Sequence, residues 1–413
     1  MPKVWLINQF ANTPDLPGHT RQYEIAKYLV KKGWEIEVFA SDFNLSERRY
    51  TKLNNFQLKK TQIFSGIIWH WLWAAPYKKN NWKRYINLFS FCIHLAFRFI
   101  GKNRFLLHHF NKYTNPDIIL ASSPQLPAAF ICLIFSKIFK KTFILEVRDL
   151  WPQVLIDQSH TKKDSFLIKL LTRIEKKLYE EADHVIVLAY GCIDYVKERG
   201  AKNVTFLPNG PDLKVFKQAE IQDHIELFDT KNPLKILYSG AHGESNNLSN
   251  VLQAAKLLKN RPVVFTFIGN GPEKLNLMRQ SKFLKNVIFK DPIPKSEMPH
   301  MISKFDAILV SLKDIPLFRY GVSPNKLYDA YAIGRPVITT VAGAINNEIE
   351  KYKLGFTAPP NNPEALANAI IKLLNTSIKD RKAMGNRARS LAENKYSRQI
   401  VNDAFDNLLK GYL

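Results

Sequence analysis

The chain has 413 residues, of which 46% are hydrophobic and 23% charged, so it is long enough for two domains and too apolar for wholesale disorder. Its net charge of +24 implies an anionic partner: nucleic acid, an anionic membrane surface or a phosphorylated substrate. Three widely spaced cysteines, Cys92, Cys132 and Cys192, show neither a disulfide framework nor metal-ligand spacing, and they fit a reducing cytoplasm.

The N-terminal half alternates strand and helix. Residues 3–8 (KVWLIN) predict a buried strand, residues 21–33 an amphipathic helix that ends at a glycine, and residues 34–41 a second strand. This βαβ unit predicts a parallel sheet. Further strands of that sheet are expected at residues 116–123, 141–149, 183–189 and 203–210, with a helix at 166–182.

A second cycle of alternation begins at residue 234. Its strands are expected at residues 234–240, 263–272, 286–294, 305–312, 336–340 and 355–360, with helices between and after them. The doubling predicts an α/β protein of two doubly wound, Rossmann-like domains. We expect the first domain at residues 1–207, the second at 208–394, and a C-terminal helix at 395–413 that crosses back to the first domain.

The positive charge is concentrated in one region. Residues 48–145 contain sixteen lysines and arginines and a single acidic residue, Asp117. Within that region, residues 77–110 have basic residues at their ends and aromatic residues throughout, which predicts an interfacial segment on an anionic membrane. The alternative is a buried helix with a solvated basic rim. No apolar run is long enough to predict a transmembrane helix, and no secretory signal is visible at the start.

Three loops between strands and helices in the second half contain candidate ligand-binding residues. The first two, at residues 238–248 and 267–273, are rich in glycine, which lets a backbone approach a ligand closely. The candidates there are Gly240, His242, Gly243, Gly269 and Gly271. The alternative for each loop is a tight turn that needs glycine without any ligand.

The third loop, residues 313–324, leads into a helix that is expected to begin near Asn325. Unpaired N–H groups at a helix start favour an anion, and Lys326 and Leu327 lie in that first turn. A lysine is electrostatically misplaced there unless it meets a diphosphate. Asp329, one turn further on, is placed to accept hydrogen bonds from ribose hydroxyls. The alternative is a surface lysine and a solvated aspartate.

Two stretches of the first domain predict contacts with an acceptor. Residues 16–21 (LPGHTR) precede the first helix, where Gly18 permits close approach and His19 and Arg21 can meet an anion or a sugar. Residues 146–153 (EVRDLWPQ) place Arg148 and Asp149 directly after a strand, where adjacent charges indicate a cleft. An Arg–Asp pair within the domain is the structural alternative.

Taken as an ordered set, these motifs resemble the retaining GT-B glycosyltransferases of family 4 over nearly the whole chain. They are most similar to the bacterial branch that includes the L-fucosamine (N-acetylfucosamine) transferases of capsule and O-antigen synthesis. The motifs are NQF with PG.TR, EVRDLWP, ADHVIVLA, LPNGPD, YSGAHG, IGNGPEK, SLKDIPLFRYGVSPNKLYD and AIGRPVI.

The resemblance implies a UDP-sugar donor bound mainly by the second domain, and no metal or other cofactor. It implies an acceptor held by the first domain, namely a polyprenyl-diphosphate-linked sugar, and an enzyme at the cytoplasmic face of the bacterial plasma membrane. Transfer in the interdomain cleft would retain the anomeric configuration, with the leaving phosphate as the base.

The resemblance also implies roles for individual residues. Lys326 would stabilise the departing diphosphate, Asp329 matches the second carboxylate of the family's Glu, seven residues, Glu motif, and Asp149 would touch the reacting sugar. The first carboxylate of that motif would fall at Gly321, where there is none. The family also has an Arg and a Lys after the strand that ends in YSG, expected here at residues 234–240. In this chain Ala241 and Asn247 stand at those positions, so Arg319 is expected to substitute as a phosphate partner.

Three rival functions fit parts of the same sequence. A nucleotide-sugar epimerase of GT-B architecture would use carboxylates and histidines for proton transfer. A membrane-peripheral scaffold that has lost catalysis would explain the missing carboxylate at Gly321. A nucleic-acid-binding protein would explain the charge, but no helix-turn-helix, zinc or RNA-recognition pattern is present.

Overall fold

The computed structural model consists of two compact units. The first contains residues 1–188, 192–207 and 402–413, and the second contains 189–191 and 208–401. The structure describes residues 1–16, 18–54, 57–78, 82–102, 115–123, 125–158, 161–220 and 232–413. Residues 103–110, the end of the segment expected at a membrane interface, and Lys79 lie outside the described residues.

The first unit is built on an eight-stranded sheet with the order β10–β9–β8–β7–β1–β2–β6–β5. Its strands are β1 (Lys3–Ile7), β2 (Glu35–Ser41), β5 (Lys59–Phe64), β6 (Ile67–Leu72), β7 (Ile118–Ser122), β8 (Thr142–Val147), β9 (His184–Val187) and β10 (Val204–Phe206). A separate two-stranded ribbon pairs β3 (Phe43–Asn44) with β4 (Arg49–Tyr50).

One edge of this sheet differs from the parallel sheet that the sequence predicts. Strands β5 and β6 form an antiparallel hairpin, joined by Ser65 and Gly66, which both have positive φ. Two successive residues with positive φ suit a tight two-residue hairpin turn. The hairpin adds β6 beside β2 in parallel, so the sheet is mixed only at its last strand.

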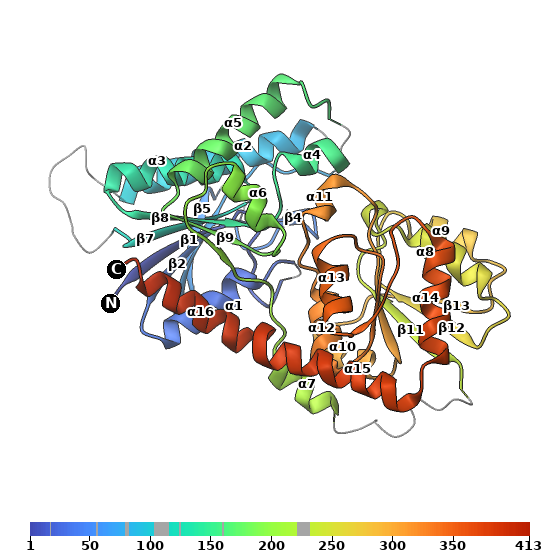
Figure 1. Cartoon of the computed structure of the whole chain (residues 1–413). Coiled ribbons are helices and arrows are strands. Elements are labelled where there is room, and N and C mark those ends of the chain that lie inside the picture. The colour runs from blue at the N-terminus through green and yellow to red at the C-terminus, as the bar shows by residue number, and fades with distance from the viewer. Residues whose placement is uncertain are drawn as a thin grey trace. The chain divides into compact units, whose positions relative to one another are not determined.

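Helices cover both faces of the first sheet (Figure 1), with α2, α3 and α5 on one face and α1 and α16 on the other. The helices of this part of the chain are α1 (Arg21–Lys31), α2 (Trp82–Lys102), α3 (Leu126–Phe139), α4 (Gln153–Gln158), α5 (Phe166–Glu181) and α6 (Cys192–Glu198). In α16 (Arg398–Lys410), the residues from Asn402 onward belong to the first unit. Among the described residues, no helix has both the length and the apolarity needed to cross a membrane.

The second unit has an entirely parallel six-stranded sheet with the order β13–β12–β11–β14–β15–β16. Its strands are β11 (Leu234–Ser239), β12 (Val263–Ile268), β13 (Val287–Lys290), β14 (Ala307–Val310), β15 (Val337–Thr339) and β16 (Gly355–Thr357). The central strands are buried on both faces because helices cover both, as their continuous apolar sequences indicate.

The helices of the second unit complete its core, in which Val251 of α8 and Leu366 of α14 are fully buried against the strands. They are α7 (Leu213–Glu220), α8 (Leu248–Leu257), α9 (Lys274–Gln280), α10 (Met298–Ser303), α11 (Pro316–Arg319), α12 (Asn325–Ile333), α13 (Ala344–Lys351), α14 (Pro363–Asn375) and α15 (Ile378–Leu391). Two doubly wound α/β units confirm the predicted fold class.

Each sheet has a position where the strand order reverses direction. In the first unit it lies between β1 and β7, and in the second between β11 and β14. Ligands of open α/β sheets bind outside the carboxyl ends of the strands at such positions. The loops after these strands are therefore the places to examine for a site.

Candidate functional site

The second unit brings the two glycine-rich loops together. Gly240 follows β11 and Gly269 follows the neighbouring strand β12, and a Cβ atom added at Gly269 would lie only 1.9 Å from the carbonyl oxygen of Gly240. Gly269 also has a φ of +150°. A side chain at this position is excluded by both the backbone conformation and the contact, so the two loops touch through their backbones.

His242 belongs to the first of these loops, and its side chain is fully buried. Its ring is fully buried near the rings of Tyr238, Phe267 and Phe289. Neither ring nitrogen has a hydrogen-bond partner among the described residues. Burial, together with the charges of Lys274 and Lys326, lowers the pKa of His242 to about 4, so the imidazole is neutral at pH 7. A nearby Gly271 packs on the His242 backbone, with 2.4 Å from its would-be Cβ to the His242 oxygen.

Lys326 extends from α12 to the first of these loops. Its Nζ atom lies 3.8 Å from the ring centroid of Tyr238 and 3.2 Å from the position of a Cβ on Gly240. No carboxylate is paired with it anywhere in the described part of the chain. Burial lowers the pKa of Lys326 to about 7. The structure therefore holds a partly desolvated ammonium group against an aromatic face.

The start of α12 adds donors beside this lysine. Pro324 occupies the cap position and no side chain caps the helix. Uncapped amides at a helix start favour a negative charge. The side chain of Leu327 is buried, and its amide donates to the carbonyl oxygen of Pro324 at 3.0 Å, so the ligand contact expected for Leu327 stays a prediction.

Asp329 lies one turn along α12 and is also unpaired within the described residues. It is half-buried, and burial raises its pKa to about 7, against the opposing effect of Lys295 and Arg398. A carboxylate and an ammonium group are thus both present on the same helix, each without a hydrogen-bonding partner. Titratable groups whose pKa values are strongly perturbed by burial are candidates for a functional site.

Arg319 and Gly243 have different surroundings from Lys326. The Arg319 guanidinium is exposed and binds both oxygens of Asp314, at 3.0 and 3.1 Å. To bind a phosphate it would have to exchange that partner. Gly243 has open space around it, with Asn246 Nδ2 at 3.8 Å from a would-be Cβ. The roles expected for both residues stay predictions.

Gly321 stands where the family motif would have its first carboxylate. Its φ is +112°, and a Cβ would lie 3.2 Å from the Cβ of Ala189 and 3.4 Å from the amide nitrogen of Gly191. The loop that contains Tyr320 and Gly321 packs on this short segment so closely that a side chain is disfavoured. The local backbone, and not only the residue type, differs from what a glutamate would need.

We expect Gly321→Glu to lower the free energy of unfolding by about 1–3 kcal/mol, because a non-glycine residue is strained at this φ. Urea denaturation measures the change. Gly243→Ala is the matched control, because Gly243 has room for a methyl group and a negative φ of −109°. Equal stability of Gly321→Glu and the wild-type protein would contradict the argument, as would a gain of transfer activity.

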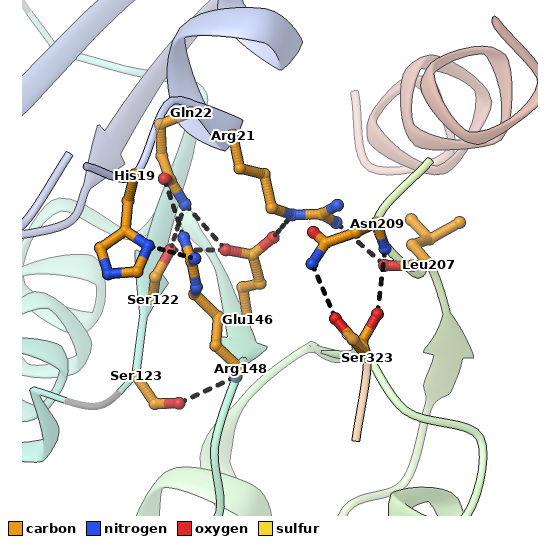
Figure 2. A network of polar contacts seen from close by, with 10 residues as sticks. All are labelled: His19, Arg21, Gln22, Ser122, Ser123, Glu146, Arg148, Leu207, Asn209 and Ser323. Carbon is orange, nitrogen blue, oxygen red and sulfur yellow. Dashed lines mark hydrogen bonds and ion pairs between the residues drawn. The ribbon is translucent and has the colours of Figure 1, made fainter. Parts of the chain in front are cut away.

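In the first unit, a buried carboxylate organises the predicted acceptor residues. Glu146, near the end of β8, is 1% exposed and lies 2.8 Å from Nε of Arg21. It also accepts hydrogen bonds from Ser122 Oγ at 2.7 Å and Gln22 Nε2 at 3.0 Å (Figure 2). Burial alone would raise the pKa of Glu146, but Arg21 and Arg148 outweigh burial and lower this pKa. Glu146 is therefore a fixed anion at neutral pH.

Arg21 has two partners within the first unit, which the sequence alone did not indicate. Besides Glu146, the Arg21 guanidinium donates to the carbonyl oxygen of Leu207 at 2.9 Å. The Arg21 side chain, which is 10% exposed, is thus held by two partners within its own unit, and its expected contact with an acceptor stays a prediction. In the second unit, the amide and side chain of Asn209 bind Oγ and O of Ser323 at 3.3 and 3.2 Å, which ties the loop before α12 to the segment after β10.

Arg148 and His19 lie at the open side of this network. Arg148 donates to Gln22 Oε1 at 3.1 Å and contacts His19 Nδ1 at 3.4 Å (Figure 2). Desolvation and the charge of Arg148 lower the pKa of His19 to about 4. A neutral imidazole beside a guanidinium can bind both hydroxyl and phosphate groups.

The remaining acceptor candidates flank the same place. Gly18 has a φ of +128°, and a Cβ there would lie 2.5 Å from Asn12 Nδ2, so the loop is closed tightly at that point. Asp149 is exposed, and its backbone oxygen is held by Ser123 Oγ at 3.1 Å. Its carboxylate is unpaired within the described residues. Trp151, two residues further along the same stretch, is buried.

Four residues of these sites were not singled out from the sequence. Glu146 could have been found from the sequence, because burying an acidic side chain in an apolar strand costs free energy unless the carboxylate is paired. No sequence pattern singles out Gln22, Ser122 or Tyr238, because their partners come from neighbouring strands and helices. No cluster of possible metal ligands is found among the residues that the structure describes.

Two family models match successive parts of the chain. Residues 19–215 match Glycosyltransferase Family 4, and residues 218–391 match Glycosyl transferases group 1. Together they include the candidate residues of both units from His19 onward.

Curated relatives agree with these models. The chain is 28% identical over 303 residues to a probable glycosyltransferase, WbjE, of Pseudomonas aeruginosa, covering 71% of this chain and 72% of the relative. It is 23% identical over 407 residues to the putative colanic acid biosynthesis glycosyl transferase WcaI of Escherichia coli K12, covering 95% and 97%.

Solved structures show the same fold at low sequence identity. Sucrose-phosphate synthase from Thermosynechococcus elongatus has a TM-score of 0.74 at 16% identity, over 100% of this chain and 99% of that one. Anabaena HepE, solved in complex with UDP and glucose, has a TM-score of 0.68 at 14% identity, over the full length of both chains.

Proposed function

We propose, from the premise that the chain is a glycosyltransferase of the GT-B fold, that it is a retaining family 4 enzyme that transfers a sugar from a UDP-sugar to a polyprenyl-diphosphate-linked sugar. The product would be a capsule or O-antigen type of surface polysaccharide, and the resemblance of the motifs favours an amino sugar such as N-acetylfucosamine. The name of the Escherichia coli relative, a colanic acid biosynthesis enzyme, supports a polysaccharide pathway.

The observation that carries this proposal is the unpaired Lys326 beside Gly240. An ammonium group whose pKa is lowered to about 7 by burial gains most from a ligand with concentrated negative charge. A diphosphate placed at the start of α12, which no side chain caps, would supply that charge where a helix N-terminus favours an anion. The Anabaena neighbour that was solved with UDP-glucose supports a nucleotide-sugar as the ligand.

In this proposal each unit contributes different chemistry. Lys326 and the start of α12 stabilise the negative charge that develops on the leaving UDP, and Asp329 accepts hydrogen bonds from the ribose. His19 and Arg148 bind the acceptor, and Asp149 contacts the reacting sugar. No protein base is assigned, because the leaving phosphate takes the proton of the acceptor hydroxyl in a retaining reaction of this type. No metal and no cofactor is required.

The decisive experiment is a donor screen. UDP-sugars are incubated with and without membrane-extracted polyprenyl-diphosphate sugars, and products are identified by mass spectrometry. A lipid-linked product that grows by one sugar and keeps the donor's anomeric configuration supports the proposal. An epimerised UDP-sugar without acceptor would instead establish an epimerase, and binding of UDP without any product would indicate a scaffold.

The pKa values of Lys326 and Asp329 predict a proton linkage that changes sign with pH. At pH 8 Lys326 is mostly neutral and Asp329 mostly ionised, so binding of UDP-glucose should take up about one proton as the diphosphate recharges Lys326. At pH 6 Lys326 is already charged and Asp329 is mostly protonated, so binding should release a proton as Asp329 ionises for the ribose. Calorimetry in buffers of different ionisation enthalpy measures both.

A matched variant separates the two groups. Asp329→Asn should abolish the release at pH 6 and keep the uptake at pH 8. Proton exchange that is the same at both pH values in the wild-type protein would contradict the assignment of these residues to the nucleotide site.

A further inference from the structure

Helix α2 is apolar on two opposite faces, and the fold explains only one of them. Phe91, Leu95 and Phe99 are fully buried under the helix, toward the sheet. Six other apolar residues are exposed, with fractions between 44% and 66%. They are Trp82, Ile86, Phe89, Ile93, Phe97 and Ile100, which we call the α2 stripe.

The spacing of the α2 stripe shows that it is one continuous surface. Successive members are four, three, four, four and three residues apart, which keeps them on one side of a helix with 3.6 residues per turn. Scattered exposed apolar residues are normal, but six in register along a single helix form a patch that indicates a partner. The helix also contains no acidic residue.

The neighbouring helix continues this surface. Helix α3 packs beside α2, with the rings of Phe99 and Phe135 at 5.1 Å. Its residues Ile134 and Ile138 are 44% and 59% exposed and lie one turn apart. The apolar surface therefore covers two adjacent helices on the outer side of the layer that α2, α3 and α5 form on the sheet (Figure 1).

The third helix of that layer makes the surface basic. Phe166 and Leu170 at the start of α5 are 81% and 41% exposed, and Lys169 and Arg173 are exposed beside them. Lys162 and Lys163, in the loop before α5, are exposed as well. None of these four basic side chains has an acidic partner among the described residues.

These features together select the partner. Nucleic acid would bind the basic side chains but would leave the apolar stripe in water. A second copy of the chain, docked through the same face, would bring one basic α5 region toward another. Only a surface that is both apolar and anionic satisfies the two helices and the basic edge at once, and a bilayer with anionic headgroups is such a surface.

We propose that the outer face of α2, α3 and α5 is the surface by which this protein docks on an anionic lipid bilayer, with α2 lying in the membrane plane. The α2 stripe enters the boundary between headgroups and acyl chains, and the basic residues of the α5 region contact headgroup phosphates. This inference deepens the proposed function and rests on it for its purpose, because a lipid-linked acceptor is present only at a membrane.

Co-sedimentation with vesicles tests the surface directly. Vesicles contain either 30% phosphatidylglycerol in phosphatidylethanolamine or phosphatidylcholine alone. The triple variant Phe89→Ser, Ile93→Ser, Phe97→Ser should bind anionic vesicles at least tenfold more weakly than the wild-type protein. A control with Leu275→Ser and Phe283→Ser, two exposed apolar residues of the second unit, should bind normally.

The basic edge has a separate signature. Replacement of Lys162, Lys163, Lys169 and Arg173 by glutamine should weaken binding to anionic vesicles, and should remove most of its dependence on salt concentration. As a measurement that does not depend on losing binding, a polarity-sensitive label on Ile93→Cys should shift to the blue on anionic vesicles. The same label on Leu275→Cys should not.

The outcomes separate this inference from the proposed function. UDP-glucose binding, measured without vesicles, should be the same in the wild-type protein and in all these variants. If the wild-type protein did not bind UDP-glucose, that result would count against the nucleotide site and not against the docking surface. Equal co-sedimentation of the triple variant and the wild-type protein would overturn the docking surface, as would no vesicle binding or an unshifted Ile93 label. A dimer that the triple variant dissociates would show that the face binds a second copy instead.

Discussion

Replacement of Lys326 by alanine should weaken UDP-glucose binding by about 10- to 100-fold, or about 1.5–3 kcal/mol, the range for hydrogen bonds to charged groups. The Nζ atom is the unpaired cation beside Gly240, a position whose φ of +139° favours glycine. Isothermal titration calorimetry at pH 7 measures the change. If Lys326 also stabilises the leaving group, turnover should fall by about 100-fold or more.

Two further variants make this test specific. Lys304→Ala removes an exposed lysine of the same unit and should bind UDP-glucose normally. Asp329→Ala should weaken binding less than Lys326→Ala, because it removes hydrogen bonds to the ribose and no contact with the diphosphate. The unfolding midpoints should stay close to that of the wild-type protein. Unchanged titration curves for Lys326→Ala and Asp329→Ala would reject this site.

Replacement of Glu146 by alanine should lower the free energy of unfolding by about 3–5 kcal/mol, as expected when one partner of a buried ion pair is removed. The change leaves the Arg21 guanidinium, on a side chain that is only 10% exposed, without its anion, and it removes the acceptor for Ser122 and Gln22. Urea denaturation followed by circular dichroism measures the effect. The same variant should lose acceptor binding, because Gln22 also positions Arg148.

The control for this variant is Glu181→Ala, which removes an exposed carboxylate that pairs with Lys137 and Lys177. Exposed pairs contribute little, so its stability should hardly change. The pH dependence provides a second check. Since the pKa of Glu146 is lowered on folding, its contribution is present at neutral pH and is lost as pH falls through the acidic range. An equal effect of both variants would contradict a buried pair at Glu146.

The strand pattern of both units could be predicted because parallel strands buried on two faces are continuous apolar runs. β1, β11 and β12 are examples, and each ends at the loop where a candidate residue follows. The hairpin of β5 and β6 was not predicted. Lys59–Phe64 is mostly exposed, so its sequence lacks a strong apolar pattern, and its strand state depends on pairing with β6.

Only those parts of the candidate site that have a local sequence signal could be predicted. Glycines after strands and a lysine at a helix start are local signals, and the structure brings Gly240, Gly269 and Lys326 together. The guanidinium of Arg319 is paired with Asp314, five residues earlier in the chain, and its expected contact with a phosphate stays a prediction. The sequence alone could not show which of Lys326 and Arg319 is free to bind a phosphate. Arg319 precedes α12 and Lys326 lies in the first turn of that helix, so both are near its start.

By itself, the sequence determined the α/β class, the two cycles of strand and helix, the confined positive charge and the aromatic-rich character of residues 77–110. These are properties of local composition and periodicity, which burial on a sheet imposes directly. Only the tertiary structure decided that Lys326 is unpaired, that Glu146 holds Arg21 and Gln22, and that six apolar residues of α2 face outward. Which charges meet, and which apolar face remains uncovered, depends on contacts between segments far apart in the chain, and no local pattern contains that information.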